Sequence, residues 1–207
     1  MITQLPFVLH LTVAEHKQLV THKPWKGKWD SDDAAIVSIK AKIRAQLIAN
    51  QNCCAYCGLP FKGEKDKQIE HIAPKAKFRQ PEFTFTLQNL VLSCVYCNNL
   101  IVKGSKPTVE LPAHRLYKKC TFLIVHPYFD NPDIHYDWTD NGDKILIQVR
   151  NNSDKGRASI KMFELDSEGM SEMRAAISSI AKLKAAKPIS VADETLVNNT
   201  LDYTAKI

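Results

Sequence analysis

The sequence predicts an α+β protein whose centre is a small zinc-stapled platform of strands and one helix, with flanking helices and a β-hairpin. Two Cys-x-x-Cys pairs, "CAYC" at 54–57 and "CVYC" at 94–97, are the first observation. A strand-like stretch between them, "KQIEHIAPK" at 67–75, is the second. The third is the helical spacing of Ile36, Ile39, Ile43 and Leu47 ahead of the first pair.

The two cysteine pairs predict a tetrahedral zinc site with Cys54, Cys57, Cys94 and Cys97 as its four thiolate ligands. Two disulfides are the rival interpretation, but they need an oxidising compartment, and no targeting segment indicates one. A redox pair would need only one motif. The remaining cysteines, Cys53 and Cys120, are expected to be packed small side chains.

The 36 residues between Cys57 and Cys94 exceed the spacing of a minimal zinc ribbon, so further structure lies between the pairs. Ile69, His71 and Pro74 fit a short strand that ends at the proline. The stretch "CVYCNNLIVKG" predicts a helix that carries Asn98 and stops at Gly104. We expect Glu70 and His71 to face the start of that helix.

The flanks divide the chain into four predicted segments. Residues 1–50 form a helical flank in which Trp25 and Trp29 stand among lysines, either to stack on bases or to anchor the core. The metal-stapled core spans 51–106, and 107–187 holds a hairpin at Asn141-Gly142 followed by one amphipathic helix. That helix is expected to place Met170, Met173, Ile177, Ile180 and Leu183 on one side. Residues 188–207 form a tail that can dock a partner, since Pro188 interrupts the helix.

Basic charge concentrates around the cysteine pairs. The net charge is +6, and residues 58–120 hold 11 basic against 5 acidic side chains, which favours a polyanionic partner such as nucleic acid. On charge alone, a solvated lysine-rich face is an equal alternative. No apolar run approaches the roughly 20 residues of a membrane helix, and no signal peptide is visible, so we expect a cytoplasmic protein without membrane contact. No Gly-x-x-x-x-Gly-Lys loop occurs, which argues against nucleotide hydrolysis by this chain.

The motifs "CAYCG", "IEHIAPK" and "QNLVLSCVYCNN" resemble the HNH endonuclease family, whose ββα-metal (His-Me finger) core is often pinned by two Cys-x-x-Cys pairs. The resemblance covers about residues 53–104. It implies that His71 is the general base, that Glu70 and Asn98 hold a divalent cation, and that Asn89 supports the loop that carries His71. Two departures stand out: Lys103 follows Asn98 by five residues where the family commonly has three, and Glu70 replaces the commoner aspartate.

The chemistry gives independent reasons for these residue types. Histidine accepts a proton from water near neutral pH. A carboxylate and an amide oxygen suit Mg²⁺ or Mn²⁺, which neutralises charge on a scissile phosphate. Four thiolates leave zinc no open position, so that metal is expected to be structural.

A wider and softer resemblance, over most of residues 31–185, is to HNH subunits of Septu-type anti-phage systems, including retron-associated versions. It rests on "HPYFDNPDIH" and "ASIKMFELD" beside the core motifs. It implies an endonuclease that cuts DNA, or RNA such as tRNA, and works with an ATPase subunit and possibly a retron reverse transcriptase and its RNA/DNA. The alternative is a non-catalytic zinc-containing nucleic-acid-binding or scaffold subunit. His126 and His135 are expected to stabilise the fold rather than form a second metal site.

Overall fold

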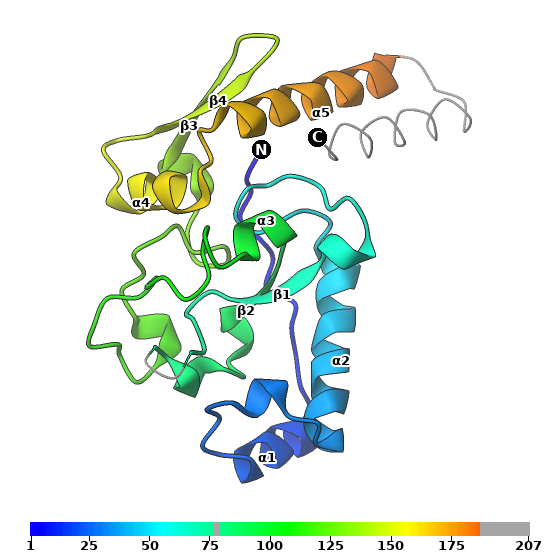
Figure 1. Cartoon of the computed structure of the whole chain (residues 1–207), viewed down its shortest axis with the longest axis vertical. Helices are drawn as coiled ribbons and strands as arrows, with labels where there is room; N and C mark the ends of the chain where they lie inside the picture. Colours follow the sequence, from blue (N-terminus) through cyan, green and yellow to red (C-terminus); the bar gives the residue numbers. More distant parts are fainter. Residues whose placement is uncertain (77–78, 187–207) are drawn as a thin grey trace.

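A computed structural model describes residues 1–76 and 79–186 of the chain (Figure 1). Two antiparallel strand pairs and five α-helices, joined by short 3-10 turns, make up this part of the protein. In chain order they are α1 (Val13–Thr21), α2 (Ala34–Asn50), β1 (Gln68–His71), β2 (Leu90–Ser93), α3 (Val95–Asn98), β3 (Tyr136–Asp140), β4 (Ile145–Val149), α4 (Asp154–Phe163) and α5 (Glu168–Ala186).

The β1–β2 pair lies in the middle of the molecule, with α1 and α2 toward one end and the β3–β4 hairpin with α5 at the other (Figure 1). The α+β architecture and its flanking helices are therefore as predicted. No helix in residues 1–76 and 79–186 is long and apolar enough to cross a membrane.

Helix α2 forms where the apolar spacing predicts it. Asp33 begins the helix by accepting hydrogen bonds from the backbone N–H groups of Ala35 and Ile36. The four predicted apolar positions are all buried, and they pack with Leu90 and Leu92 of β2 in one core cluster. This packing holds one face of β2, so the strand that leads into the second cysteine pair is held against a long helix.

Strands β1 and β2 pair antiparallel in a register that brings His71 opposite Leu90 and Gln68 opposite Ser93. The predicted strand at 67–75 thus forms, and it ends at His71, before the predicted limit at Pro74. All four residues of β2 are buried. Because β2 leads directly to Cys94, the strand pair carries the second cysteine pair as well as Glu70 and His71.

The predicted helix over 94–104 is wrong in length, because α3 stops after one turn at Asn98. The side chain of Asn99 accepts hydrogen bonds from the N–H groups of Ile101 and Val102, at 2.9 and 2.8 Å, which starts a separate turn. Gly104 closes that turn with φ +44°, and a Cβ there would meet the Leu100 carbonyl oxygen at 2.8 Å. The turn brings Lys103 back toward β1.

The C-terminal half contains the predicted hairpin, and its connection spans residues 141–144 between the paired Asp140 and Ile145. The single predicted amphipathic helix is two helices, α4 and α5, because Glu164 ends α4 in the left-handed conformation at φ +51°. Ile160 and Phe163 of α4 are buried in the same core cluster as the cysteines.

The face of α5 differs in part from the prediction. Met170, Met173 and Ile177 pack against the core, whereas Leu183 is 65% exposed. The predicted tail at 188–207, with Pro188, lies outside the described residues. The division at 50/51, 106/107 and 187/188 remains a prediction.

Candidate metal centre and active site

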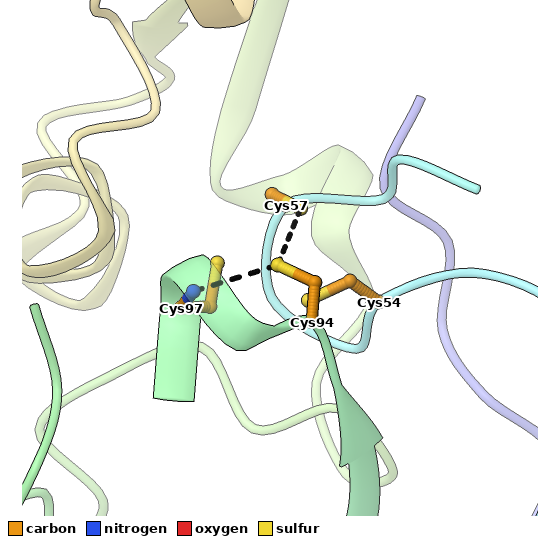
Figure 2. A group of neighbouring side chains, drawn as sticks. All are labelled: Cys54, Cys57, Cys94 and Cys97. Carbon is orange, nitrogen blue, oxygen red and sulfur yellow. Dashed lines mark hydrogen bonds between the residues drawn. The ribbon is translucent and has the colours of Figure 1, made fainter. Parts of the chain in front are cut away.

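The four predicted cysteine ligands meet at one point. Their sulfur atoms all lie within 4.8 Å of one another, and Figure 2 shows Cys54 and Cys57 on one loop and Cys94 and Cys97 at the junction of β2 and α3. A tetrahedral site with zinc–sulfur bonds of about 2.3 Å requires sulfurs separated by roughly 3.8 Å. The Sγ atoms of Cys57 and Cys94 are 3.9 Å apart. The geometry fits a zinc ion, and the cysteines are positioned to bind a metal.

Local backbone geometry builds this cluster. The N–H of Cys97 points at Cys94 Sγ at 3.4 Å, so the first turn of α3 turns an amide toward a sulfur. Gly58 follows the first pair with φ +70°, and a Cβ there would meet the backbone N of Ile2 at 2.9 Å. The first cysteine turn therefore needs glycine at this position, both for its backbone conformation and for the close approach of the N-terminal segment at Ile2.

The electrostatics of the cluster also call for a cation. Burial raises the pKa of Cys54, but hydrogen bonds from the other three cysteines outweigh it and hold that pKa well below its usual range. Hydrogen bonding to Cys54 in turn raises the pKa values of Cys57 and Cys97. Without a metal, the cluster therefore favours an ionised Cys54 beside neutral thiols at Cys57 and Cys97. Four thiolates in this buried place need a metal ion to balance their charge.

Arg174 adds a positive charge from α5 beside the cluster. It is buried, its guanidinium lies over the ring of Trp138 at 5.3 Å, and its Nε and Nη2 have no hydrogen-bond partner among the described residues. Burial lowers its pKa, while the charges of Cys57, Asp166 and Cys97 act in the opposite direction. A buried cation is costly unless negative charge lies near it, so a tetrathiolate metal site is the neighbour that suits this side chain.

Strand β1 places the predicted catalytic pair on opposite faces, because adjacent strand residues alternate. His71 is buried, and its Nε2 lies 3.1 Å from the carbonyl oxygen of Thr84. A carbonyl oxygen only accepts, so Nε2 carries the hydrogen and Nδ1 keeps the lone pair. Burial lowers the pKa of His71 to about 3, so the ring is neutral at neutral pH. The imidazole is therefore neutral with a free lone pair on Nδ1, and burial makes it a weaker base than an exposed histidine.

The N-terminal flank covers His71. The ring of Trp29 meets the imidazole edge to face, with 4.5 Å between centroids, and Lys40 Nζ donates to the Trp29 carbonyl at 2.7 Å. The next residue, Asp30, forms an ion pair with Lys75 at 2.8 Å. Trp25 and Trp29 both pack against the α2 core cluster. Their role as core anchors is therefore observed, and Trp29 also shields the candidate base.

Glu70 faces the other side of β1, where Lys103 meets it. Lys103 is completely buried, forms an ion pair with Glu70 through its Nζ, and donates to the His71 carbonyl at 2.8 Å. Burial raises the pKa of Glu70, and the charge of Lys103 opposes that effect. The spacing of five residues from Asn98 predicted that Lys103 lies outside the site. The turn that begins at Asn99 instead brings Lys103 to Glu70. The asparagine pair at 98–99 is the signal in the sequence that predicts this break.

Asn98 lies on the same face of β1 as Glu70, although its hydrogen bond is to Gln68. Its Nδ2 donates to Gln68 Oε1 at 2.7 Å, and residues two apart on a strand share a face. The Asn98 amide oxygen is therefore turned away from that bond. A carboxylate and an amide oxygen on one face are hard donors of the kind that Mg²⁺ and Mn²⁺ take. In this conformation the Lys103 ammonium is the cation beside Glu70.

Asn89 ties the loop after β1 to the start of β2. Its Oδ1 accepts from the N–H of Ala73 at 2.6 Å, and its Nδ2 donates to the carbonyls of Ala73 and Phe83, each at 3.0 Å. The hydroxyl of Tyr117 donates to the same Oδ1 at 3.0 Å. With its amide satisfied in a fully buried place, Asn89 holds the backbone that follows His71.

His126 extends this network. Its Nδ1 accepts from the N–H of Tyr128 at 3.2 Å, so in the neutral ring Nε2 donates to the Tyr117 hydroxyl at 3.0 Å. Burial lowers the pKa of His126 to about 3. His135 instead contacts Ser153, with 2.6 Å between Nδ1 and Oγ. Among the described residues, the four cysteines are the one group of three or more His, Cys, Asp or Glu placed to hold a metal.

Comparison with known proteins bears on the same residues. Residues 54–103 match the HNH endonuclease family. Over 147 residues the chain is 26% identical to the Septu protein PtuB of Bacillus mycoides (strain KBAB4), a match that covers 63% of this chain. The match covers 48% of that relative, so it spans about half of the relative's length. Residues 54–103 are therefore similar to the HNH endonuclease family, and 63% of the chain is similar to PtuB.

Proposed function

We propose that this chain is a metal-dependent HNH endonuclease that hydrolyses phosphodiester bonds in DNA, or in RNA such as tRNA, as an effector of anti-phage defence. The observation that supports the proposal is that Glu70 and His71 are adjacent at the end of β1, while Asn98 bonds to Gln68 of the same strand. The four-cysteine cluster anchors the strand pair to which β1 belongs. The family match over residues 54–103 and the resemblance to a Septu protein support the nuclease and the defence role.

His71 is the general base of this proposal. Its Nδ1 accepts a proton from water, the water oxygen forms a bond to phosphorus, and the bond from phosphorus to the leaving oxygen breaks. The leaving oxygen keeps that electron pair and takes up a proton from solvent. The Thr84 carbonyl keeps the hydrogen on Nε2, and so keeps Nδ1 available. Asn89 positions the loop behind the base by bonding to the backbone of Ala73.

Glu70 and Asn98 are the proposed ligands of a catalytic Mg²⁺ or Mn²⁺. When bound, such an ion supplies charge neutralisation at the scissile phosphate and the leaving oxygen. Lys103 must give up its contact with Glu70, or share it, before the carboxylate binds a divalent ion. The cysteine cluster in this proposal holds structural zinc.

The same contacts support control by a partner. Trp29 covers His71, and Lys103 already neutralises Glu70, so both proposed catalytic groups are closed in the isolated chain. We propose that an ATPase subunit of the same defence system, with a retron reverse transcriptase and its RNA/DNA where one is present, opens them. The purified chain alone is then weak or inactive. Strong, nonspecific cleavage by the purified chain would contradict this control.

The test is phage protection by cells that carry the complete operon with wild-type protein or with His71→Ala. We expect protection to be lost at normal soluble protein level and normal zinc content, because His71 is not a zinc ligand. His16→Ala is the matched control, since His16 is exposed on α1. It removes an imidazole without touching the site and should leave protection intact.

A non-catalytic zinc-containing nucleic-acid-binding or scaffold subunit is the second candidate. The buried Lys103–Glu70 ion pair favours it, because that pair is complete without a divalent ion. This candidate expects His71→Ala and Glu70→Gln to protect as well as wild type at equal protein level. Retained protection in both variants would replace the nuclease proposal with this one.

A further inference from the structure

We infer that the groove between residues 23–26, 81–88 and 113–119 binds an unpaired stretch of nucleic acid, with its phosphates on the groove's cations and its bases against the apolar walls. The inference rests on the proposed nuclease function and names the form of the substrate. It concerns a surface outside Glu70, His71 and Asn98.

The groove is large and lies over the loop that supports the candidate base. Its volume is about 1270 Å³, above the roughly 300 to 1,000 Å³ of pockets that take small molecules. Its floor includes Phe83 and Tyr117, which are buried and pack edge to face at 5.0 Å. Both contact Asn89, through the Phe83 carbonyl and the Tyr117 hydroxyl. A ligand in the groove therefore lies directly on the network that holds the segment after His71.

The charges along the groove point to a polyanion. Five cationic side chains line it and all are exposed: Lys23, Lys26, Arg115, Lys118 and Lys119. Within the part of the chain that the structure describes, no ion pair joins any of these five to a carboxylate, and Glu82 is the one acidic residue of the lining. Unpaired cations held this close together repel one another. A phosphate backbone relieves that repulsion and releases its own counterions.

The walls between these cations favour unpaired bases over a duplex. Pro24, Trp25 and Leu116 line the groove beside the basic residues, and Leu116 is 55% exposed. A double helix presents phosphates and sugars to such a surface and leaves the apolar walls without contacts. An unpaired strand offers both phosphates and flat base faces, which is the combination that single-strand-binding grooves use. Lys23 already lies 4.7 Å from the centre of the Trp25 ring, so cation and aromatic surface are adjacent.

The test measures binding separately from cleavage. A fluorescein-labelled oligo-dT is titrated with full-length His71→Ala protein, and the affinity is followed by fluorescence anisotropy over a series of salt concentrations. The same titration uses Lys118→Ala/Lys119→Ala in the His71→Ala background. Each lost phosphate contact should lower the slope of log affinity against log salt by about 0.7 for a single strand. We expect the double variant to bind more weakly at every salt concentration, with a slope smaller by roughly 1.4.

The matched control removes the same charge elsewhere. Lys62 and Lys161 are exposed, do not line the groove, and form no ion pair with a described carboxylate. Lys62→Ala/Lys161→Ala should leave affinity and salt slope as they are in the His71→Ala parent. Equal weakening by the two double variants, or no weakening by Lys118→Ala/Lys119→Ala, would overturn the inference.

Two further binding measurements distinguish single-stranded nucleic acid from duplex DNA and from acidic protein segments. A blunt DNA duplex with the same number of phosphates should bind more weakly than oligo-dT, and tighter, groove-dependent binding of the duplex would overturn the single-strand assignment. Poly-glutamate should not displace oligo-dT at equal charge concentration. Displacement would mean that the groove recognises acidic protein segments instead.

Failure of this inference is distinct from failure of the nuclease proposal. If His71→Ala abolishes protection while the groove variant binds oligo-dT normally, the nuclease proposal holds and the substrate lies elsewhere. If the groove variant loses binding while His71→Ala protects fully, the inference about the groove is correct, and the chain binds nucleic acid without cutting it.

Discussion

Two polar clusters, the four cysteines and the Glu70–Lys103 pair, differ in whether the protein itself balances their charge. The four cysteines bring four thiol groups close together, and ionisation of all four needs a cation that the described residues do not supply. Glu70 and Lys103 are opposite charges that already neutralise each other. Full ionisation of the first cluster therefore needs a metal ion, whereas the second carries its own counter-charge, which opposes the effect of burial on Glu70. A carboxylate paired in this way must release its cation before it can bind a metal ion.

The largest effect is expected from a substitution in the four-cysteine cluster. Cys94→Ser removes one of four thiolates, and structural zinc supplies on the order of 10 kcal/mol of folding free energy in small zinc peptides. We expect loss of bound zinc and a large fall in the free energy of unfolding, measured by metal analysis and urea denaturation. Cys53→Ser is the control, because Cys53 lies outside the cluster. A Cys94→Ser protein with wild-type zinc and midpoint would refute a structural role.

The next largest effect is expected from removing the cation of the Glu70–Lys103 pair. Lys103→Met leaves Glu70 buried without a cation, which should cost roughly 3 to 5 kcal/mol of stability. Urea denaturation without added divalent ions measures this loss. Lys103→Met/Glu70→Gln should recover most of it, because no buried charge then remains.

The same variant tests the proposed ion site. Mn²⁺ should stabilise Lys103→Met more than wild type in thermal unfolding, since the ion then binds a carboxylate with no ammonium to displace. Equal shifts in the two proteins would show that Glu70 does not hold the ion.

The neutral network behind the site predicts a pH dependence. The pKa of His126 is lowered to about 3 in the fold, so the unfolded chain binds a proton near pH 6.5 that the folded chain does not. Stability is therefore full above about pH 6.5 and falls as pH drops toward 3, by on the order of 4 kcal/mol for this group. His71, with its pKa lowered to about 3, adds to the same slope.

Denaturation across this pH range, with His126→Gln beside wild type, measures the contribution of His126. The variant should show a shallower fall in unfolding free energy on acidification. His16→Gln, on an exposed helix position, should keep the wild-type slope. Identical slopes in all three proteins would mean that His126 is not held neutral by the fold.

The smallest effect concerns one hydroxyl. Tyr117→Phe removes the donor to Asn89 Oδ1 and the acceptor for His126, while the ring and its packing remain. We expect a loss of about 0.5 to 1.5 kcal/mol for each net hydrogen bond. Tyr128→Phe, which removes one hydroxyl bond to the Leu90 carbonyl, is the matched comparison in urea denaturation. A Tyr117→Phe protein as stable as wild type would show that the network adds nothing beyond packing.

The sequence by itself determined the features that depend on spacing along the chain. Two Cys-x-x-Cys pairs specify four ligands for one metal, and the apolar period from Ile36 to Leu47 specifies a helix and its buried face. The asparagine and glycine at 141–142 specify the hairpin. Each of these signals is local, because the residues that carry it lie within one turn, one helix or one strand pair.

Only the tertiary structure decided how distant segments close around the site. Lys103 reaches Glu70 because Asn99 breaks the helix, and Trp29 covers His71 because α2 packs the flank against β2. The basic groove joins three segments that are separate in the sequence. Burial and charge pairing between such segments depend on packing in three dimensions, and no spacing along the chain encodes which side chain fills the space beside a carboxylate.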